Sequence, residues 1–357
     1  MAEYKLAVIA GDGVGPEVIS EGKKVLDALS KSNPNLKFTY NDLPWGSAYY
    51  RETGKMMPDD GLETLKSNQA IFFGAVGDPN IPDHITLQGL LLPMRRAFDQ
   101  AISIRPCYLH PGVDSPIVGK KPGDIDMVIY RENTEGEYAP VGGRLYPGTP
   151  HETVIQTGVF TKRGTERIIR AAFEGCILRN KQNKVTSVTK SNAQAFSMVF
   201  WDEVFEEVAS DYPQIQTESL LVDRAAMDLA RWPESFDVIV ASNLFADILS
   251  DIAAVVTGSM GLAASANINP EREYPSMFES VHGAAFDIAG KGIANPLATI
   301  SAAGLMLEHL GEHTCAQQID KAVARCLDER KVITGDLGGS NSTSEVGDEI
   351  VRLLDLV

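Results

Sequence analysis

The chain has 357 residues, of which 44% are hydrophobic and 22% charged, and its formal net charge is −16 at pH 7. This length predicts two domains, and the acidic balance argues against a nucleic-acid surface, because phosphate binding needs excess Lys and Arg. The four cysteines include no CxxC pair, the N-terminal apolar run is too short for a signal peptide, and no stretch has membrane-spanning length. We therefore expect a soluble cytoplasmic protein that binds neither nucleic acid nor membrane.

Short β-rich runs alternate with amphipathic stretches along the chain. Strands are expected at residues 6–10, 70–74, 127–130, 184–188 and 238–241. Helices are expected at residues 16–30, 163–180, 193–210, 225–232 and 297–310. This alternation predicts an α/β layered fold with a largely parallel sheet. Between residues 137 and 159, Gly, Pro and alternating polar residues indicate an arm or hairpin.

The first expected strand leads into the glycine-rich turn Gly11-Asp12-Gly13-Val14-Gly15-Pro16-Glu17. A dinucleotide fingerprint needs GxGxxG, and the position of its third glycine is occupied by Pro16. Proline suits the first turn of a helix. We interpret the segment as a tight strand-to-helix turn whose backbone approaches a ligand, in preference to a phosphate cradle.

Three arginines occur in separate segments, each at the end of an expected element. They are Arg95 in LLPMRR, Arg105 before a proline, and Arg131 after the strand at 127–130. Together they could clamp one carboxylate through paired hydrogen bonds, although each alone is more often part of a surface ion pair. Tyr138 follows Arg131 by seven residues, and its simpler interpretation is a packing aromatic.

Acidic residues at helical spacing indicate a metal site. Asp247 and Asp251 are four residues apart in an apolar run that reads as a helix, so both carboxylates lie on one face. Partly buried like charges need a positive partner, and a hard divalent cation prefers oxygen ligands; two solvated helix acids are the alternative. Asp223 ends another apolar run and could supply a third carboxylate. Lys190 ends a strand, where α/β active-site residues often lie, although a solvated lysine is equally compatible.

Residues 278–296 form a loop rich in Gly and Ala before the helix expected at 297–310. Small residues let backbone approach a flat or phosphorylated ligand. Asp287 could accept hydrogen bonds from a ribose hydroxyl, and its charge would oppose a 2′-phosphate.

Taken together, these segments resemble the isocitrate/isopropylmalate dehydrogenase family, the metal-dependent β-decarboxylating hydroxyacid dehydrogenases. The motifs occur in the family's order over nearly the whole chain: GDGVGPE, LLPMRR, IRP, YRENTEGEY, TKSN, VD, NLFADILSD and ESVHGAAFDIAGKGIANP. The resemblance implies a two-domain α/β fold unlike the Rossmann fold, with mixed sheets flanked by helices. Residues 1–100 plus 255–357 would form a large cofactor-binding domain, and residues 101–254 a smaller dimerisation and metal/substrate domain. It also implies a homodimer with clasping arms and shared active sites.

The resemblance assigns roles to individual residues. The substrate carboxylate would be bound by Arg95, Arg105 and Arg131. The catalytic pair would be Tyr138 and Lys190. The ligands of Mg²⁺ or Mn²⁺ would be Asp223, Asp247 and Asp251, with Lys190 and Asp223 coming from the neighbouring subunit. The cofactor site would contain Glu279, His282, Gly283, Ala284, Ala285, Asp287, Ile288 and Asn295, and Asp287 marks the NAD-preferring branch. An additional requirement for K⁺ is left open.

Within the family, residues 84–89, the RENTEGEY run and the AFDI sequence most resemble the D-malate and tartrate dehydrogenases. This implies NAD-dependent oxidation and decarboxylation of a small 2-hydroxy diacid. Isopropylmalate remains an alternative substrate because residues 90–92 are apolar, and a non-catalytic regulatory subunit of the same fold is a further alternative. Two departures, Gln88 and Ser103, are expected to touch the region that reads the substrate's C3 substituent.

Overall fold

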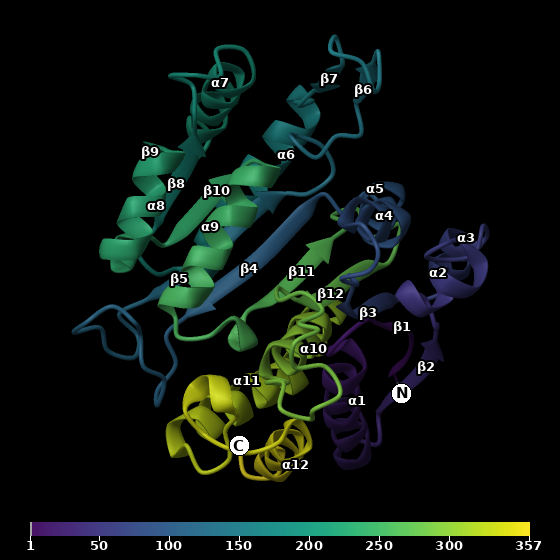
Figure 1. Ribbon diagram of the computed structural model, residues 1–357. Coiled ribbons are helices and arrows are strands. Elements are labelled where there is room, and N and C mark those ends of the chain that lie inside the picture. The colour runs from purple at the N-terminus through teal and green to yellow at the C-terminus, as the bar shows by residue number, and fades with distance from the viewer. Residues whose placement is uncertain (1) are drawn as a thin grey trace.

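The computed structural model, which describes residues 2–357, contains a ten-stranded mixed sheet with helices on both faces (Figure 1). The strand order is β2-β1-β3-β12-β11-β4-β5-β10-β8-β9. The strands are β1 (Ala2–Gly11), β2 (Leu36–Asp42), β3 (Ala70–Ala75), β4 (Ile102–Tyr108), β5 (Asp126–Glu132), β8 (Lys184–Thr189), β9 (Gln216–Leu221), β10 (Val238–Ala241), β11 (Ala264–Ile268) and β12 (Ser276–Ser280).

Twelve α-helices and a π-helical turn are found among the described residues. The helices are α1 (Gly15–Ser32), α2 (Ser47–Thr53), α3 (Gly61–Lys66), α4 (Asp83–Thr86), α5 (Leu92–Ala97), α6 (Lys162–Arg179), α7 (Ser197–Ala209), α8 (Val222–Arg231), α9 (Asn243–Val256), α10 (Leu297–Leu310), α11 (His313–Glu329) and α12 (Thr343–Leu354). The π-helical turn, η1 (Leu87–Leu91), connects α4 to α5. No helix of residues 2–357 has the length and apolarity to cross a membrane.

Both ends of the chain contribute to one half of the sheet. Strands β1, β2, β3, β11 and β12 lie on one side of the β11–β4 boundary, and the strands between residues 102 and 241 lie on the other. Strands β4 and β11 run antiparallel to their neighbours, whereas the remaining pairs are parallel. The largely parallel sheet predicted from the sequence is therefore correct away from this central boundary. The division into two domains stays a prediction.

Alternating side chains of β1 enter two different cores, as the period of a strand requires. Leu6 and Val8 belong to the main core, which also contains residues of α1 and α10. Ala7 and Ile9 face the opposite side and pack in a second cluster with Trp45 and residues of α5. Burial on both faces explains why residues 6–9 of the strand are continuously apolar.

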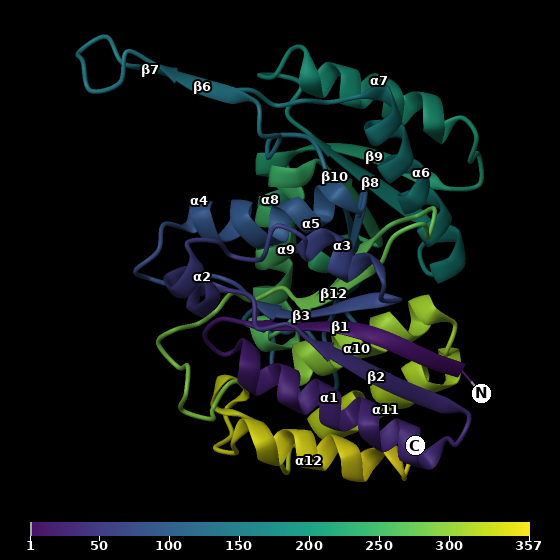
Figure 2. The same ribbon diagram turned by 90° about the vertical axis from the view of Figure 1, so that its right-hand side faces the viewer.

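Helices α6 and α7 cover one face of the 102–241 half, and α8 and α9 cover the other (Figure 2). Helix α9 packs against β4, β5 and β10. It therefore lies beside the two strands that carry Arg105 and Arg131. This contact places Asp247 of α9 close to Arg105 and Arg131.

A short antiparallel hairpin, β6 (Gly142–Leu145) and β7 (Thr153–Gln156), projects away from the body of the molecule (Figure 2). All eight of its strand residues are exposed, including Leu145, Val154 and Ile155. The hairpin lies within the stretch 137–159, for which an arm was expected.

All five expected strands and all five expected helices are present. The bounds of β10 and α10 are as expected, whereas each of the others is shifted at one or both ends. Helix α7 starts at Ser197, not at residue 193, because the N–H groups of Ala193 and Gln194 both donate to the Lys190 carbonyl in a separate turn. The glycine-rich turn connects β1 to α1, as expected from the sequence. A Cβ on Gly11 would lie 1.9 Å from the carbonyl oxygen of Ala75, and one on Gly13 would lie 1.8 Å from that of Ala284. Close packing against neighbouring backbone therefore requires these glycines, and the approach of a ligand to the turn stays a prediction.

Candidate active site

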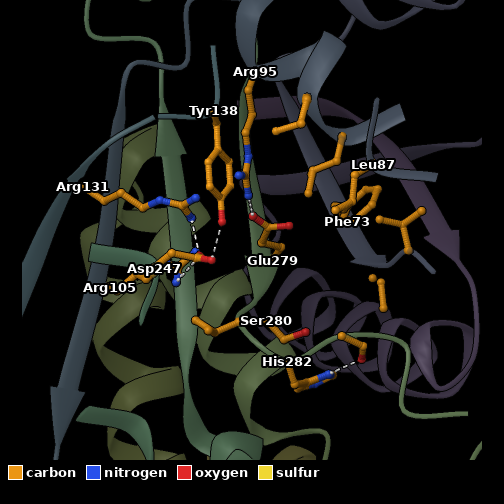
Figure 3. Close-up of a pocket in the computed structure, with 17 residues that line it drawn as sticks. Phe73, Leu87, Arg95, Arg105, Arg131, Tyr138, Asp247, Glu279, Ser280 and His282 are labelled. Atoms are coloured by element: carbon orange, nitrogen blue, oxygen red, sulfur yellow. Dashed lines mark hydrogen bonds and ion pairs between the residues drawn. The ribbon is translucent and has the colours of Figure 1, made fainter. Parts of the chain in front are cut away.

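A cavity of about 200 Å³ lies between α5, α9 and the ends of β3 and β12 (Figure 3). It gathers eight of the sixteen site residues expected from the sequence. We call it the arginine cavity, and its lining is Phe73, Gly74, Ala75, Val76, Leu87, Leu91, Leu92, Arg95, Arg105, Arg131, Tyr138, Asp247, Glu279, Ser280, Val281, His282 and Gly283.

Asp247 is the centre of the polar contacts in this cavity (Figure 3). Its Oδ1 lies 2.9 Å from Arg131 Nη1 and 3.4 Å from Arg105 Nη1. Its Oδ2 accepts a 2.9 Å hydrogen bond from the Tyr138 hydroxyl. The side chains of Arg131 and Arg105 are only 2% and 6% exposed, compared with 37% for Asp247. The one carboxylate therefore compensates two buried guanidinium groups.

The pKa shifts in this cluster follow from burial and charge. Burial raises the pKa of Asp247, but the positive charges of Arg131 and Arg105 outweigh burial and leave it below its ordinary value. Burial, followed by the charge of Arg105, lowers the pKa of Arg131, and Asp247 opposes that shift. Asp247 is thus held as a carboxylate, and it keeps the guanidinium groups charged.

One face of α9 holds both arginines in place. Arg131 donates from Nε to the Asn243 carbonyl at 3.1 Å and from Nη2 to Asn243 Oδ1 at 2.6 Å. Arg105 Nη1 donates to Ser250 Oγ at 2.5 Å. Asn243, Asp247 and Ser250 succeed one another at intervals of three or four residues, which puts them on one face of the helix.

Glu137 binds the N-terminal end of α9, where Asn243 contacts Arg131. Its Oε1 accepts a 2.8 Å hydrogen bond from the Ser242 hydroxyl, and its Oε2 accepts a 3.2 Å bond from the Leu244 N–H. A carboxylate that binds the free N–H groups of a first helical turn stabilises it. Glu137 precedes Tyr138, so the same segment that supplies the tyrosine anchors the helix. The sequence reading missed this residue.

Arg95 is buried differently, against Glu279. Its Nη2 lies 2.7 Å from Glu279 Oε1, and the two side chains are 5% and 8% exposed. Glu279 Oε1 also accepts a 2.7 Å hydrogen bond from Asn267 Nδ2. In the described chain, the Nε atoms of Arg95 and Arg105 are buried without a hydrogen-bond partner. Unsatisfied buried donors beside a cavity indicate a site for an anion.

Tyr138 is placed to act as a proton donor. Burial raises its pKa, and the negative charge of Asp247 raises it further. The guanidinium carbon of Arg131 lies 5.5 Å from the centre of the tyrosine ring. The phenol therefore stays protonated at neutral pH, and its hydroxyl is at the cavity.

Asp251 completes an acidic pair on α9. Burial, followed by the negative charge of Asp247, raises its pKa. Within residues 2–357 its carboxylate forms no ion pair or hydrogen bond with another side chain. Two nearby carboxylates, one of them without a partner, fit the oxygen ligands that Mg²⁺ or Mn²⁺ prefers. However, no group of three or more possible His, Cys, Asp or Glu ligands is gathered within the described chain.

Lys190 and Asp223 lie outside the arginine cavity. Lys190 follows β8, Asp223 is in the first turn of α8, and their side chains form an ion pair. The Lys190 hydrogen bond lowers the pKa of Asp223. One chain thus supplies two separate parts of the expected site: the cavity with Asp247, and this Lys190–Asp223 pair.

A second cavity, of about 370 Å³, adjoins the first, since His282 lines both. We call it the loop groove, and its lining is Val14, Ser259, Met260, Gly261, His282, Ala285, Ile288, Ile293, Ala294, Asn295, Gly335 and Asp336. Four residues expected to bind the cofactor therefore line it. Of the others, Ala284 is buried and Asp287 is exposed.

Asp336 is a groove residue that the sequence reading missed. It accepts hydrogen bonds from Asn295 Nδ2 at 3.0 Å and from Ser259 Oγ at 2.5 Å. Burial lowers the pKa of His282, although the charge of Asp336 opposes this. The turn Gly335-Asp336-Leu337-Gly338-Gly339 was the available signal, since glycine-rich turns often approach ligands.

The two departures from the family pattern, Gln88 and Ser103, do not line the arginine cavity. Gln88 points to Arg96, whose Nη2 donates to its Oε1 at 3.2 Å. Ser103 is buried, and its hydroxyl lies 3.3 Å from Ser265 Oγ. The apolar wall is instead made by Leu87, Leu91 and Leu92. The π-helical turn at 87–91 shifts which side chains face inward, because it winds more residues per turn than an α-helix.

The chain is similar to known proteins over nearly its whole length. A family model described as isocitrate/isopropylmalate dehydrogenase matches residues 5–350. A protein of Agrobacterium vitis named "Probable tartrate dehydrogenase/decarboxylase TtuC'" is 49% identical over 354 residues, covering 99% of this chain and 98% of its own. D-malate dehydrogenase (decarboxylating) of Escherichia coli (strain K12) is 48% identical over 362 residues, covering 99% of each.

Two further proteins of other named activities are similar to the chain. A 3-isopropylmalate dehydrogenase of Thermobifida fusca (strain YX) is 47% identical over 348 residues, covering 98% of this chain and 97% of its own. The crystal structure of isocitrate dehydrogenase from Methylococcus capsulatus superposes with a TM-score of 0.88 at 33% identity, covering 98% of this chain and 99% of that one.

We predict that Arg95→Met destabilises the fold by about 3 kcal/mol, because it leaves the Glu279 carboxylate buried without its cation. Urea unfolding at pH 7 measures this change. Adding Glu279→Leu to the variant should recover part of the loss, since the double variant removes both buried charges.

The matched control is Arg96→Met, which removes the neighbouring guanidinium bonded to Gln88 on the surface. Its effect should stay within about 0.5 kcal/mol. Equal free energies of unfolding for the Arg95→Met and Arg96→Met variants would show that the buried Arg95–Glu279 pair does not stabilise the fold more than a surface contact does.

Proposed function

Because this chain belongs to the isocitrate/isopropylmalate dehydrogenase family and is an oxidoreductase that acts on a CH–OH group, we propose that it is an NAD-dependent, divalent-metal-dependent enzyme. Its proposed reaction is the oxidation and decarboxylation of a small 2-hydroxy diacid, either D-malate or tartrate. A volume of about 200 Å³ suits such a molecule, since drug-sized ligands usually occupy about 300–1,000 Å³.

The charge balance around Asp247 is the observation that carries the proposal. Three arginines line the cavity, and three carboxylates, those of Asp247, Glu279 and Asp251, lie among or beside them. This set is neutral as a whole, so a dianionic diacid and a divalent cation could enter together without leaving uncompensated charge. Either ion alone would disturb the balance.

In this proposal, Arg95, Arg105 and Arg131 bind the substrate carboxylate that is lost as CO₂. Guanidinium groups match a carboxylate in shape and charge, and the unsatisfied Nε–H groups of Arg95 and Arg105 support an additional acceptor nearby. Asp247 and Asp251 would hold Mg²⁺ or Mn²⁺, which would favour loss of the hydroxyl proton, and a bound NAD would supply the acceptor for the hydride of C2.

The chain's own ionisable groups would move the protons. Lys190 of a second copy removes the proton of the C2 hydroxyl. Tyr138, kept protonated by burial and by Asp247, returns a proton to C3 after the carboxylate has left. With D-malate, the balanced reaction consumes NAD⁺ and yields pyruvate, CO₂ and NADH.

The loop groove is the proposed NAD site. Its volume is larger than that of the arginine cavity, and His282 is shared between them, so a ligand in the groove could reach a substrate in the cavity. Asp287 is exposed next to Ile288 of the groove. Its carboxylate would accept hydrogen bonds from a ribose hydroxyl and repel the 2′-phosphate of NADP.

Two features support a homodimer with shared active sites. Lys190 and Asp223 lie apart from Asp247 within one chain, so a second copy could supply them. Helices α8 and α9 pack together and leave Met227, Ile248 and Val255 exposed. An apolar surface on these helices, together with the projecting hairpin β6–β7, suits burial against the same surface of a partner.

3-Isopropylmalate dehydrogenase is the second candidate function. The observation that favours it is the wall of Leu87, Leu91 and Leu92, which suits an alkyl group at C3 better than the hydroxyl of tartrate.

Absorbance of NADH at 340 nm across D-malate, L- and meso-tartrate and 3-isopropylmalate, with Mn²⁺ and K⁺ present, tests the proposal. We expect D-malate or a tartrate to give the highest kcat/KM. A higher value for 3-isopropylmalate would select the second candidate. If no diacid yields NADH, the alternative of a non-catalytic regulatory subunit is favoured. The same assay without K⁺ shows whether that ion is required.

We predict that Asp251→Asn lowers metal-dependent turnover by at least about 100-fold, because it removes a charged ligand and not merely a supporting contact. The measurement is a Mn²⁺ titration of initial rate. Asp328→Asn, on the exposed surface of α11, is the control and should retain wild-type turnover. Full activity of the Asp251→Asn enzyme without added metal would remove Asp251 from this role.

A further inference from the structure

Helix α1 is joined to the loop groove by an apolar contact. Val14 lines the groove, and the N–H of Val14 donates to the Ala284 carbonyl at 2.9 Å. Val14 and Val18 form a small buried cluster, whose other members come from the loop: Ala294, with Ala285, Ile288 and Ala289 packed against it. The start of α1 therefore packs against the loop that lines the groove.

Glu17 adds a charged contact between α1 and the same loop. Its Oε1 accepts a 2.6 Å hydrogen bond from the Gly290 N–H, and its Oε2 accepts a 3.0 Å bond from the Gly292 N–H. Each oxygen thus binds one backbone donor of the same short loop. Hydrogen bonds to an ionised carboxylate are about twice as strong as those between neutral groups.

A simpler interpretation of Glu17 is an acid that stabilises the positive end of its own helix. However, no side chain caps the N-terminus of α1 by a hydrogen bond. The two donors that Glu17 does bind are 273 and 275 residues away along the chain. The geometry therefore indicates a contact between distant segments, in addition to any effect on the helix.

The bound loop has a backbone that needs such support. Gly290 and Gly292 both have positive φ, of 75° and 64°. On its far side, Thr343 of α12 donates its N–H to the Gly292 carbonyl at 2.9 Å and its hydroxyl to the Ala294 carbonyl at 2.7 Å. Contacts from both α1 and α12 thus hold the loop. Among these contacts, Glu17 contributes the charged group.

We propose that Glu17 is a positioning residue for the dinucleotide: it fixes residues 288–292 in the conformation that NAD binds. The proposal rests on the assignment of the loop groove to NAD. Glu17 does not line the groove, so it acts through the loop. A loop that is ordered before binding saves the conformational entropy that the ligand would otherwise have to offset.

The test is Glu17→Gln, which keeps the size of the side chain but removes its charge and one of its two acceptors. We expect the Kd for NADH, measured by fluorescence titration, and the KM for NAD to rise about tenfold. The kcat and the KM for the diacid should stay within about twofold, because Glu17 does not contact the arginine cavity. A merely structural role would lower the active fraction, and thus kcat, without a change in KM.

Asp27→Asn is the matched control on the same helix. Asp27 accepts a 2.8 Å hydrogen bond from the Tyr40 hydroxyl, far from the loop. This variant should bind NADH like the wild type. An unchanged NADH Kd in the Glu17→Gln enzyme, or an equal weakening in the Asp27→Asn enzyme, would overturn the proposal.

Hydrogen exchange of the ligand-free protein separates this proposal from the assignment of the groove. The Glu17→Gln variant should exchange the amides of residues 288–292 at least about fivefold faster than the wild type, with no change in the Tm of the whole protein. If the wild type binds no NADH, the proposed function fails, whereas exchange still decides whether Glu17 holds the loop. Unchanged exchange of these amides would overturn the anchoring itself.

Discussion

The site depends on one carboxylate that keeps two buried arginines together. Arg105 and Arg131 belong to neighbouring strands, and each is almost fully removed from water. Their mutual repulsion in this environment would be costly without Asp247 between them. Asp247 comes from the helix that packs on those strands, so the packing of α9 on the sheet places this carboxylate beside both guanidinium groups.

The third arginine meets the same requirement on the other side of the β11–β4 boundary. Arg95 precedes β4 in the chain and pairs with Glu279 of β12, in the half of the sheet built by the chain ends. The arginine cavity is therefore lined from both halves, and a change in their relative position would change the distances among its charges. This arrangement suits a site that binds an anion and a cation together, with the charged walls fixed beforehand.

Local patterns in the sequence were sufficient for much of this site. The spacing of Asp247 and Asp251 predicted a shared helical face, and the three arginines were expected to converge, as they do in one cavity. Contacts between distant residues could not be predicted in this way. The pairing of Arg95 with Glu279 joins residues 184 positions apart, and nothing near Arg95 in the sequence specifies it.

The differences between expectation and structure have physical causes as well. Gln88 was expected near the substrate from the family resemblance, whereas the π-helical turn at 87–91 presents Leu87 to the arginine cavity. The glycines at 11 and 13 pack closely against the backbone of Ala75 and Ala284, and a sequence does not specify which segments make such an approach. Asp336 was missed because its partners, Asn295 and Ser259, lie in other segments.

The central claim is that Asp251 of one copy and Lys190 of another complete a single active site. Subunit exchange between two inactive variants, Lys190→Met and Asp251→Asn, tests it most directly, with native mass spectrometry to count mixed dimers. Equal mixing should restore about a quarter of wild-type activity, because half of the dimers would be mixed and each would hold one intact site. Mixed dimers that form but remain inactive would contradict the account.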